Sequence, residues 1–281
     1  MLAQRVVTAV VMLAILLAAV LAPQFWPLAL VLGLAAAAAL WEWLRLTLPR
    51  CVSAWAWLAG AVFMVATSAV LFTPIGQELL INAANVALWP LLWVTVLFWL
   101  GVALPSVVRG DPQRPASSVF YSIAAVVALL ATWLSVIILL LHKGPWYLVS
   151  LLALIWFADI AAYFCGKAFG RHKLAPRVSP GKTWEGAFGG VVAATAWTMA
   201  SSIWPGTFGA DLLQQWSFAV ALGFAILLGA ISIVGDLFES LLKRRAGFKD
   251  SSGLLPGHGG VFDRIDALLP VAPLALLLVG V

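Results

Sequence analysis

The most restrictive feature of this sequence is a succession of long apolar runs with very few charges inside them. Charged residues make up 10% of the chain and hydrophobic residues 64%, whereas soluble domains carry about 25% charged residues. A helix needs about 20 mostly apolar residues to cross a bilayer. The runs of about this length cover residues 5–22, 25–46, 53–74, 86–106, 119–141, 146–169, 183–204, 213–242 and 261–281. Lipid is therefore the expected solvent of this chain.

Backbone polar groups inside lipid must be hydrogen-bonded within the protein, which leaves helices and closed barrels as folds. The two-residue alternation of barrel strands is absent. We therefore expect an all-α, polytopic integral membrane protein with about nine transmembrane helices. The first run follows Arg5 and is similar to a signal peptide. Residues 23–26 are a poor cleavage context and another apolar run follows at once, so we interpret the first run as a retained helix.

Basic residues indicate the orientation. They occupy alternate connections, in which Lys and Arg mark the cytoplasmic side: Arg5, Arg45, Arg50, Arg109, Arg114, Lys167, Arg171, Lys173, Arg177, Lys182, Lys243, Arg244, Arg245 and Lys249. The other connections carry only Glu78, Asp211 and Lys143. The N-terminus is thus predicted to be cytoplasmic. An interfacial aromatic belt is predicted from residues near the run ends, namely Trp26, Trp41, Trp43, Trp146 and Tyr147.

Acidic residues divide the chain into two regions. Residues 1–145 contain three and residues 146–281 contain eight. We expect 1–145 to be a scaffold of membrane helices that can offer a dimer contact, and 146–281 to carry the chemistry. Within run 213–242 and just beyond it, polar residues recur at helical spacing on one face: Ser232, Asp236, Glu239, Ser240 and Lys243.

This polar stripe predicts a buried site. A carboxylate at the bilayer centre costs about 2.5–3.5 kcal/mol on insertion scales, so the stripe should face protein or a water-filled cavity. The alternative is an interhelical network of salt bridges without chemistry. Two acids and a base on one face favour the site.

The start of the last run carries a second group of acids. Asp263 and Asp266 share a helix face, so they repel unless a cation lies between them or Arg264 neutralises one. The His-Gly-Gly sequence at 258–260 would let backbone N–H groups approach an oxyanion. Carboxylates without Cys or His at ligand spacing favour a hard cation, and Mg²⁺ takes carboxylates together with substrate phosphates.

The third group lies between runs 146–169 and 183–204. Ser179 is expected to cap a helix that begins at Pro180, so that Lys182 and free N–H groups face a basic loop and form an anion site. The Gly-Lys-Thr sequence at 181–183 is not a P-loop, because Pro176 stands where glycine is required and no strand is expected before it. The alternative is that these bases only set the topology.

Acids for a divalent metal and bases for phosphates therefore meet at one membrane boundary. Metal-assisted phosphoryl or nucleotidyl transfer needs positioning and charge neutralisation, not a covalent nucleophile. The residues between 240 and 266 form a long gapped motif that resembles the signature of CDP-diacylglycerol synthases, also called phosphatidate cytidylyltransferases. It consists of Ser240, Lys243, Arg244, Lys249, Asp250, Ser252, Leu255, Pro256, His258, Gly259, Gly260, Asp263, Arg264 and Asp266.

The resemblance implies a reaction. The enzyme would join CTP to phosphatidic acid and release pyrophosphate, with Mg²⁺ and with room for a second cation. It would be a homodimer in the bacterial inner membrane, act in phospholipid biosynthesis and face the cytoplasm. Asp236 and Asp263 would hold the metal. The predicted catalytic set is Asp236, Asp263, Lys243, Lys249, His258 and Arg264.

The predicted substrate-binding set combines the resemblance with the charge pattern. It contains Asp159, Lys167, Arg171, Ser179, Lys182, Thr183, Glu185, Glu239, Ser240, Arg244, Asp250, Gly259, Gly260 and Asp266. Two other classes share the composition. One is another lipid-linked phosphotransferase, which uses a CDP-alcohol or a polyprenyl phosphate; the aspartate string of the CDP-alcohol enzymes is absent here. A transporter for an organic anion lacks support, because no internal repeat or matched pair of broken helices is present.

Overall fold

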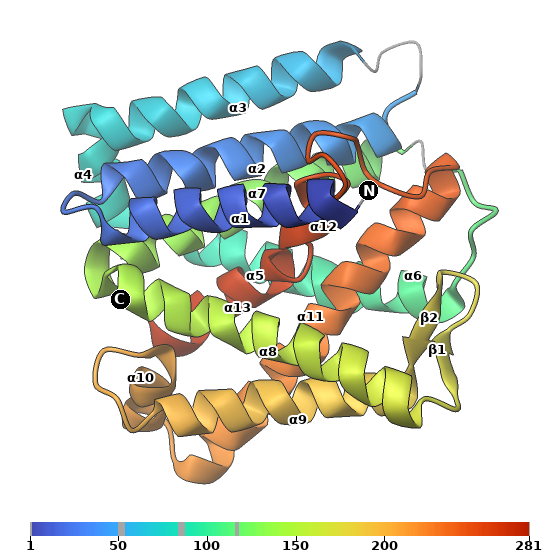
Figure 1. The fold of residues 1–281 in the computed structure, drawn as a ribbon. Coiled ribbons are helices and arrows are strands. Elements are labelled where there is room, and N and C mark those ends of the chain that lie inside the picture. Colours follow the sequence, from blue (N-terminus) through green and yellow to red (C-terminus); the bar gives the residue numbers. More distant parts are fainter. Residues whose placement is uncertain (1, 50–53, 84–87, 116–117, 281) are drawn as a thin grey trace.

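The computed structural model describes residues 2–49, 54–83, 88–115 and 118–280, so Arg50 lies outside it. The chain is almost entirely helical, which confirms the all-α prediction (Figure 1). The elements of the first region are α1 (Leu2–Leu21), α2 (Trp26–Thr47), α3 (Ala54–Phe72), α4 (Pro74–Ala83), α5 (Leu88–Phe98), the π-helix η2 (Trp99–Ala103), α6 (Leu104–Arg109) and α7 (Val119–Lys143).

The second region begins with the long helix α8. Its elements are α8 (Pro145–Phe169), β1 (Lys173–Ala175), β2 (Ser179–Thr183), α9 (Trp184–Ser201), α10 (Phe208–Gln215), α11 (Phe218–Ala246), α12 (Phe262–Ile265) and α13 (Leu268–Val279). Figure 1 shows most of the long helices side by side, with α11 crossing obliquely between the two regions. α11 packs against α9 and α13, and it also contacts α2.

Among the described residues, six helical segments are long and apolar enough to cross a membrane, which makes this a multi-pass membrane protein. They are Trp26–Thr47, Trp55–Phe72, Leu88–Arg109, Val119–Lys143, Pro145–Phe169 and Phe218–Ala246. The other three predicted runs are helical but do not reach this standard. α1 has an apolar part of only Val6–Leu21, α9 is rich in Gly, Ala and Thr, and the last run is divided into α12 and α13.

The predicted helix start at Ser179 is wrong. Residues Ser179–Thr183 form β2, which pairs antiparallel with β1 through Lys173 opposite Thr183 and Ala175 opposite Ser179. The helix begins at Trp184, and the Thr183 hydroxyl caps it by accepting from the Gly186 N–H at 3.2 Å. A strand therefore does precede this helix. Lys182 lies on that strand, so the predicted anion site at a helix N-terminus is not formed there.

The aromatic-belt prediction stays a prediction for two of its five residues and fails for the other three. Trp26 and Trp146 are exposed, but Trp41, Trp43 and Tyr147 are buried. The Trp43 ring stacks on Phe262 with centroids 5.0 Å apart, and it contacts Trp99 and Phe238. An aromatic residue near the end of an apolar run can therefore pack between helices, and its place in the sequence does not show whether it lies at the membrane interface. This aromatic cluster joins α2, η2, α11 and α12.

Small residues let α8 and α9 approach closely. A Cβ added at Gly190 would lie 2.9 Å from the Ala158 carbonyl oxygen and 3.2 Å from the Ala162 Cβ. A Cβ added at Gly186 would lie 2.8 Å from the Ala162 carbonyl oxygen. Glycine at such positions is what close packing of membrane helices requires. The α8–α9 contact in turn holds β2 against the rest of the bundle.

Replacing Gly190 with leucine should separate α8 from α9. Overpacking typically costs about 1–3 kcal/mol, so the unfolding temperature in detergent should fall. Gly223→Leu is the matched control, because Gly223 is in helix α11 and a Cβ there meets nothing within 4 Å. Thermal unfolding of both purified variants tests this, and equal melting temperatures would contradict the packing argument.

Candidate active site

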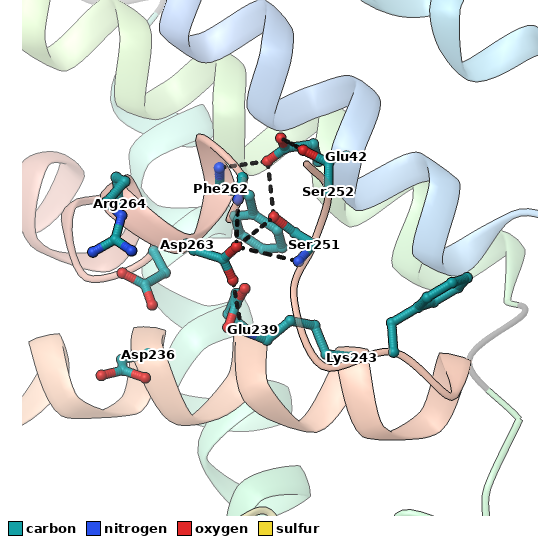
Figure 2. Close-up of polar contacts among 12 residues, drawn as sticks. Glu42, Asp236, Glu239, Lys243, Ser251, Ser252, Phe262, Asp263 and Arg264 are labelled. Carbon is teal, nitrogen blue, oxygen red and sulfur yellow. Dashed lines mark hydrogen bonds and ion pairs between the residues drawn. The ribbon is translucent and has the colours of Figure 1, made fainter. Parts of the chain in front are cut away.

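The polar stripe of α11 faces protein, as the sequence predicts. The Lys243 ammonium lies between two carboxylates, 2.7 Å from Glu239 Oε2 and 2.5 Å from Asp263 Oδ1. Glu239 is only 1% exposed. Figure 2 shows this arrangement, in which α11 supplies Glu239 and Lys243 and α12 supplies Asp263. The fold thus brings Asp263 to Lys243, which lies 20 residues earlier in the sequence.

The second oxygen of Asp263 organises the loop that precedes α12. Asp263 Oδ2 accepts from the Ser251 N–H at 3.2 Å, from the Ser251 hydroxyl at 3.0 Å and from the Gly260 N–H at 2.7 Å. Its first oxygen accepts from the Lys243 ammonium. Four donors, one of them charged, therefore converge on this carboxylate, and hydrogen bonds of this kind favour its ionised form.

Glu42 is the site residue that sequence reasoning missed. Its carboxylate is 0% exposed and accepts four hydrogen bonds (Figure 2). Oε1 accepts from the Ser252 hydroxyl at 2.5 Å and from the Val261 N–H at 3.0 Å. Oε2 accepts from the Ser251 hydroxyl at 3.0 Å and from the Phe262 N–H at 2.6 Å. Glu42 thus ties α2 to both ends of the loop 251–262.

One sequence signal could have identified Glu42. It is the only acidic residue in the apolar run 25–46, and an acid in such a run needs a partner. The structure adds the reason for glycine at 260, because a Cβ there would lie 2.5 Å from both Glu42 oxygens and 2.0 Å from the Ser251 hydroxyl. The sequence predicts that Gly259 and Gly260 let backbone N–H groups reach a substrate oxyanion. In this structure, however, the Gly260 N–H donates to Asp263 Oδ2.

Asp236 lies one turn before Glu239 on α11 and forms an ion pair with Lys182 of β2. Asp266 and Asp159 are close enough to Asp236 and Lys182 to interact with them electrostatically. The Asp266 carboxylate also accepts from the Ala267 N–H at 2.8 Å. The structure therefore brings carboxylates from α8, α11 and the α12–α13 junction around one lysine.

Arg264 does not neutralise Asp263. Among the described residues Asp263 pairs with Lys243, whereas the Arg264 guanidinium donates to the His258 carbonyl oxygen at 2.5 Å. Arg264 lies close enough to Asp159 to interact with it electrostatically. Figure 2 places its side chain on the Asp236 side of α12. The arginine thus adds positive charge to the Lys182 group.

The donor set is compatible with a divalent cation that also binds substrate. In the part of the chain that the structure describes, no three His, Cys, Asp or Glu side chains are grouped as a complete metal cage. Mg²⁺ usually takes one or two carboxylates and completes its shell with water and substrate phosphates. Glu239 Oε1 is buried and lacks a hydrogen-bond partner among the described residues. An additional cation beside it would satisfy that oxygen.

The other predicted residues make local contacts or are exposed. His172 binds Glu185 through Nδ1 at 2.7 Å, and Arg244 donates to the Val178 carbonyl oxygen at 3.3 Å. The Lys167 ammonium lies 5.9 Å from the Tyr163 ring. Ser240 and His258 are half-buried. The side chains that lie exposed in loops are Arg171, Lys249 and Asp250. The structure does not test their assignment to substrate, which stays a prediction.

Comparison with known proteins assigns the family. Residues 3–281 match the cytidylyltransferase family. The chain belongs to this family. A phosphatidate cytidylyltransferase of Pseudomonas aeruginosa is 40% identical over 97% of this chain and 95% of its own length. That of Haemophilus influenzae is 33% identical over 97% of this chain and 96% of its own. That of Thermotoga maritima is 36% identical over 66% of this chain and 67% of its own.

As a member of the cytidylyltransferase family, the protein is an enzyme that transfers a nucleotidyl group. The resemblance inferred from the signature string is confirmed by similarity that extends over almost the whole chain. The cytidylyltransferase match also includes α2, which carries Glu42. The first region is thus part of the family's fold.

Glu42→Gln should weaken both stability and turnover. An amide has one acceptor oxygen in place of two, so some buried N–H donors of the loop would lose their acceptor. Each unsatisfied donor would lower the free energy of unfolding by about 1–3 kcal/mol. We expect a lower unfolding temperature and faster proteolysis within residues 248–261. Glu78→Gln is the matched control, because Glu78 is exposed on α4. Unchanged melting and proteolysis of Glu42→Gln would contradict the role of Glu42 in holding the loop.

Proposed function

We propose that this cytidylyltransferase makes CDP-diacylglycerol and pyrophosphate from CTP and phosphatidic acid, a step of phospholipid biosynthesis. The observation that supports this most is the meeting of Lys182, Lys243 and Arg264 with five carboxylates at one end of a helix bundle. The reaction joins two polyanions, one of them a membrane lipid. The relatives named phosphatidate cytidylyltransferase support the same substrates.

The chemistry needs charge neutralisation and alignment. A phosphate oxygen of phosphatidic acid attacks the α-phosphorus of CTP, and the bond from that phosphorus to the bridging oxygen breaks. Pyrophosphate leaves with the bond electrons. A phosphate monoester is already largely ionised at pH 7, so no general base is required. Lys182, Lys243 and Arg264 would neutralise the transferred and leaving phosphates, which is the main contribution a protein makes to phosphoryl transfer.

Mg²⁺ would bind at Asp236 and Asp263, with a second cation near Glu239. Bound metal supplies charge neutralisation on the phosphates and holds them for in-line attack. In the described arrangement both carboxylates pair with lysines, Asp236 with Lys182 and Asp263 with Lys243. Metal binding would release these two ammonium groups, which could then bind the substrate phosphates.

The charge pattern supports the proposed orientation. The basic connections, in which Lys and Arg mark the cytoplasmic side, include Lys182 and Lys243. Arg264 follows directly after the last of these connections. We propose nine membrane passes with a cytoplasmic N-terminus, in the inner membrane of a bacterium, as a homodimer. CTP would then enter from the cytoplasm while the acyl chains of phosphatidic acid stay in the bilayer.

The reaction can be tested with purified protein in detergent. Supplied with labelled CTP, phosphatidic acid and Mg²⁺, it should form a chloroform-soluble nucleotide lipid, and chelation of Mg²⁺ should stop this. Asp263→Asn should lower the rate by at least about 100-fold, since it removes a charged ligand of the proposed metal, which would neutralise the reacting phosphates. Its melting temperature reports folding separately. Absence of product from a folded wild-type protein, with an active reference enzyme, would reject the proposal.

Lys182→Ala should weaken the use of CTP more than it alters folding. We expect KM for CTP to rise by about tenfold or more, because a charge-assisted contact to phosphate is lost. Lys173→Ala is the matched control, since Lys173 is an exposed lysine of the same hairpin. Equal effects of the two substitutions on KM would show that the hairpin lysines only set topology.

A further inference from the structure

A large apolar cavity has none of the predicted site residues in its lining. It has a volume of about 1180 Å³ and is bounded by η2, α6, β1, α9 and α11. Leu104, Phe188, Val192, Ile226 and Val234 are among its lining residues. Pockets for small ligands commonly measure about 300–1,000 Å³, so this cavity is large enough for a long apolar group.

α11 contributes to both this cavity and the active site. Ile233, Val234 and Leu237 line the cavity, whereas Glu239 and Lys243 meet Asp263. At 100° per residue, Glu239 lies about 160° from Leu237 around the helix axis, but Asp236 lies only about 60° from Ile233. The two sites are therefore neighbours on α11, although none of the acids or lysines to which catalysis is assigned is in the cavity lining.

A basic pocket adjoins one end of the apolar cavity. It has a volume of about 250 Å³ and is lined by Ser106, Arg109, Asp111, Arg114, Arg177 and Arg245. Arg109 and Arg177 line both spaces. In Figure 1, α6, the β1–β2 hairpin and the C-terminal end of α11 lie at the same end of the bundle. Four arginines against one aspartate give this pocket a net positive charge.

Two of these arginines are fixed and two remain available. Arg245 donates to the Asp111 carbonyl oxygen at 3.0 Å and to the Tyr121 hydroxyl at 3.2 Å. Arg114 pairs with the Asp111 carboxylate at 3.4 Å. Arg109 and Arg177 are exposed, and across residues 2–49, 54–83, 88–115 and 118–280 no carboxylate forms an ion pair with either.

An apolar cavity that ends in unpaired arginines fits an amphiphile with an anionic head. Guanidinium groups match phosphate geometry and bind it through charge-assisted hydrogen bonds. The apolar walls offer few partners to the backbone of a protein segment, whereas an acyl chain needs none. We propose that this site binds an anionic glycerophospholipid of the bilayer, with its phosphate on Arg109 and Arg177 and its acyl chains in the cavity.

This lipid is a bound partner and not the lipid undergoing reaction. Its phosphate would lie on arginines that belong to α6 and to the β1–β2 turn, while Asp236 and Asp263 would hold the metal of the reaction. The site therefore recognises a phosphodiester lipid as readily as a phosphomonoester. It would couple the composition of the surrounding leaflet to the packing of α6, α9 and α11.

Native mass spectrometry of the purified protein can test this with phosphatidylglycerol and phosphatidylcholine of identical acyl chains. Phosphatidylglycerol should be retained and should raise the melting temperature, and phosphatidylcholine should do so much less. Arg109→Ala combined with Arg177→Ala should weaken phosphatidylglycerol binding by about tenfold or more, and the double lysine variant should keep part of it. Equal retention of the two lipids by the wild type would overturn the proposal.

Two further variants separate this site from its alternatives. Ala196→Trp places a bulky ring at the cavity wall and should abolish the preference, while Val65→Trp, at an exposed position of α3, should not. Asp236→Asn should bind phosphatidylglycerol as the wild type does. Loss of binding in Asp236→Asn would place the lipid in the active site. A change from dimer to monomer in Ala196→Trp, without any lipid preference in the wild type, would assign the cavity to a second copy of the chain.

Discussion

The site depends on buried carboxylates that are held by donors from other elements of the chain. A lone carboxylate among membrane helices is costly, and Glu42 and Glu239 are both buried. Lys243 forms ion pairs with Glu239 and Asp263, Lys182 forms one with Asp236, and four neutral donors at residues 251–262 surround Glu42. These contacts hold α2, β2, α11 and α12 in one arrangement, because loss of the donors around Glu42 or Glu239 would leave a buried carboxylate without a partner.

The same pairing provides a resting state for the proposed reaction. The lysines that neutralise the carboxylates are also the groups that substrate phosphates need. In the proposed reaction, Lys182 and Lys243 would move from the carboxylates to the substrate phosphates, and Asp236 and Asp263 would hold the metal in their place. Each charged group would then keep a partner both before and after the substrates bind.

α11 has two roles. It carries Asp236, Glu239 and Lys243 toward the hairpin and α12, and its residues Ile233, Val234 and Leu237 form part of the wall of the apolar cavity. The aromatic cluster of Trp43, Trp99, Phe238 and Phe262 packs beside Glu239 and joins α11 to the first region. The catalytic residues and the cavity thus share one helix.

The sequence by itself determined the helical membrane fold, the polar face of α11 and the family, because apolar run length, helical periodicity and a long charged string are local properties. It did not determine the β1–β2 hairpin, since the Ser-Pro sequence at 179–180 fits a helix start as well as a strand. It also did not reveal which donors Glu42 would meet, because these lie more than 200 residues away. Only the tertiary structure decided the partner of each buried charge, since neutralisation depends on distances of a few ångströms between elements whose order in the chain says nothing about their contact.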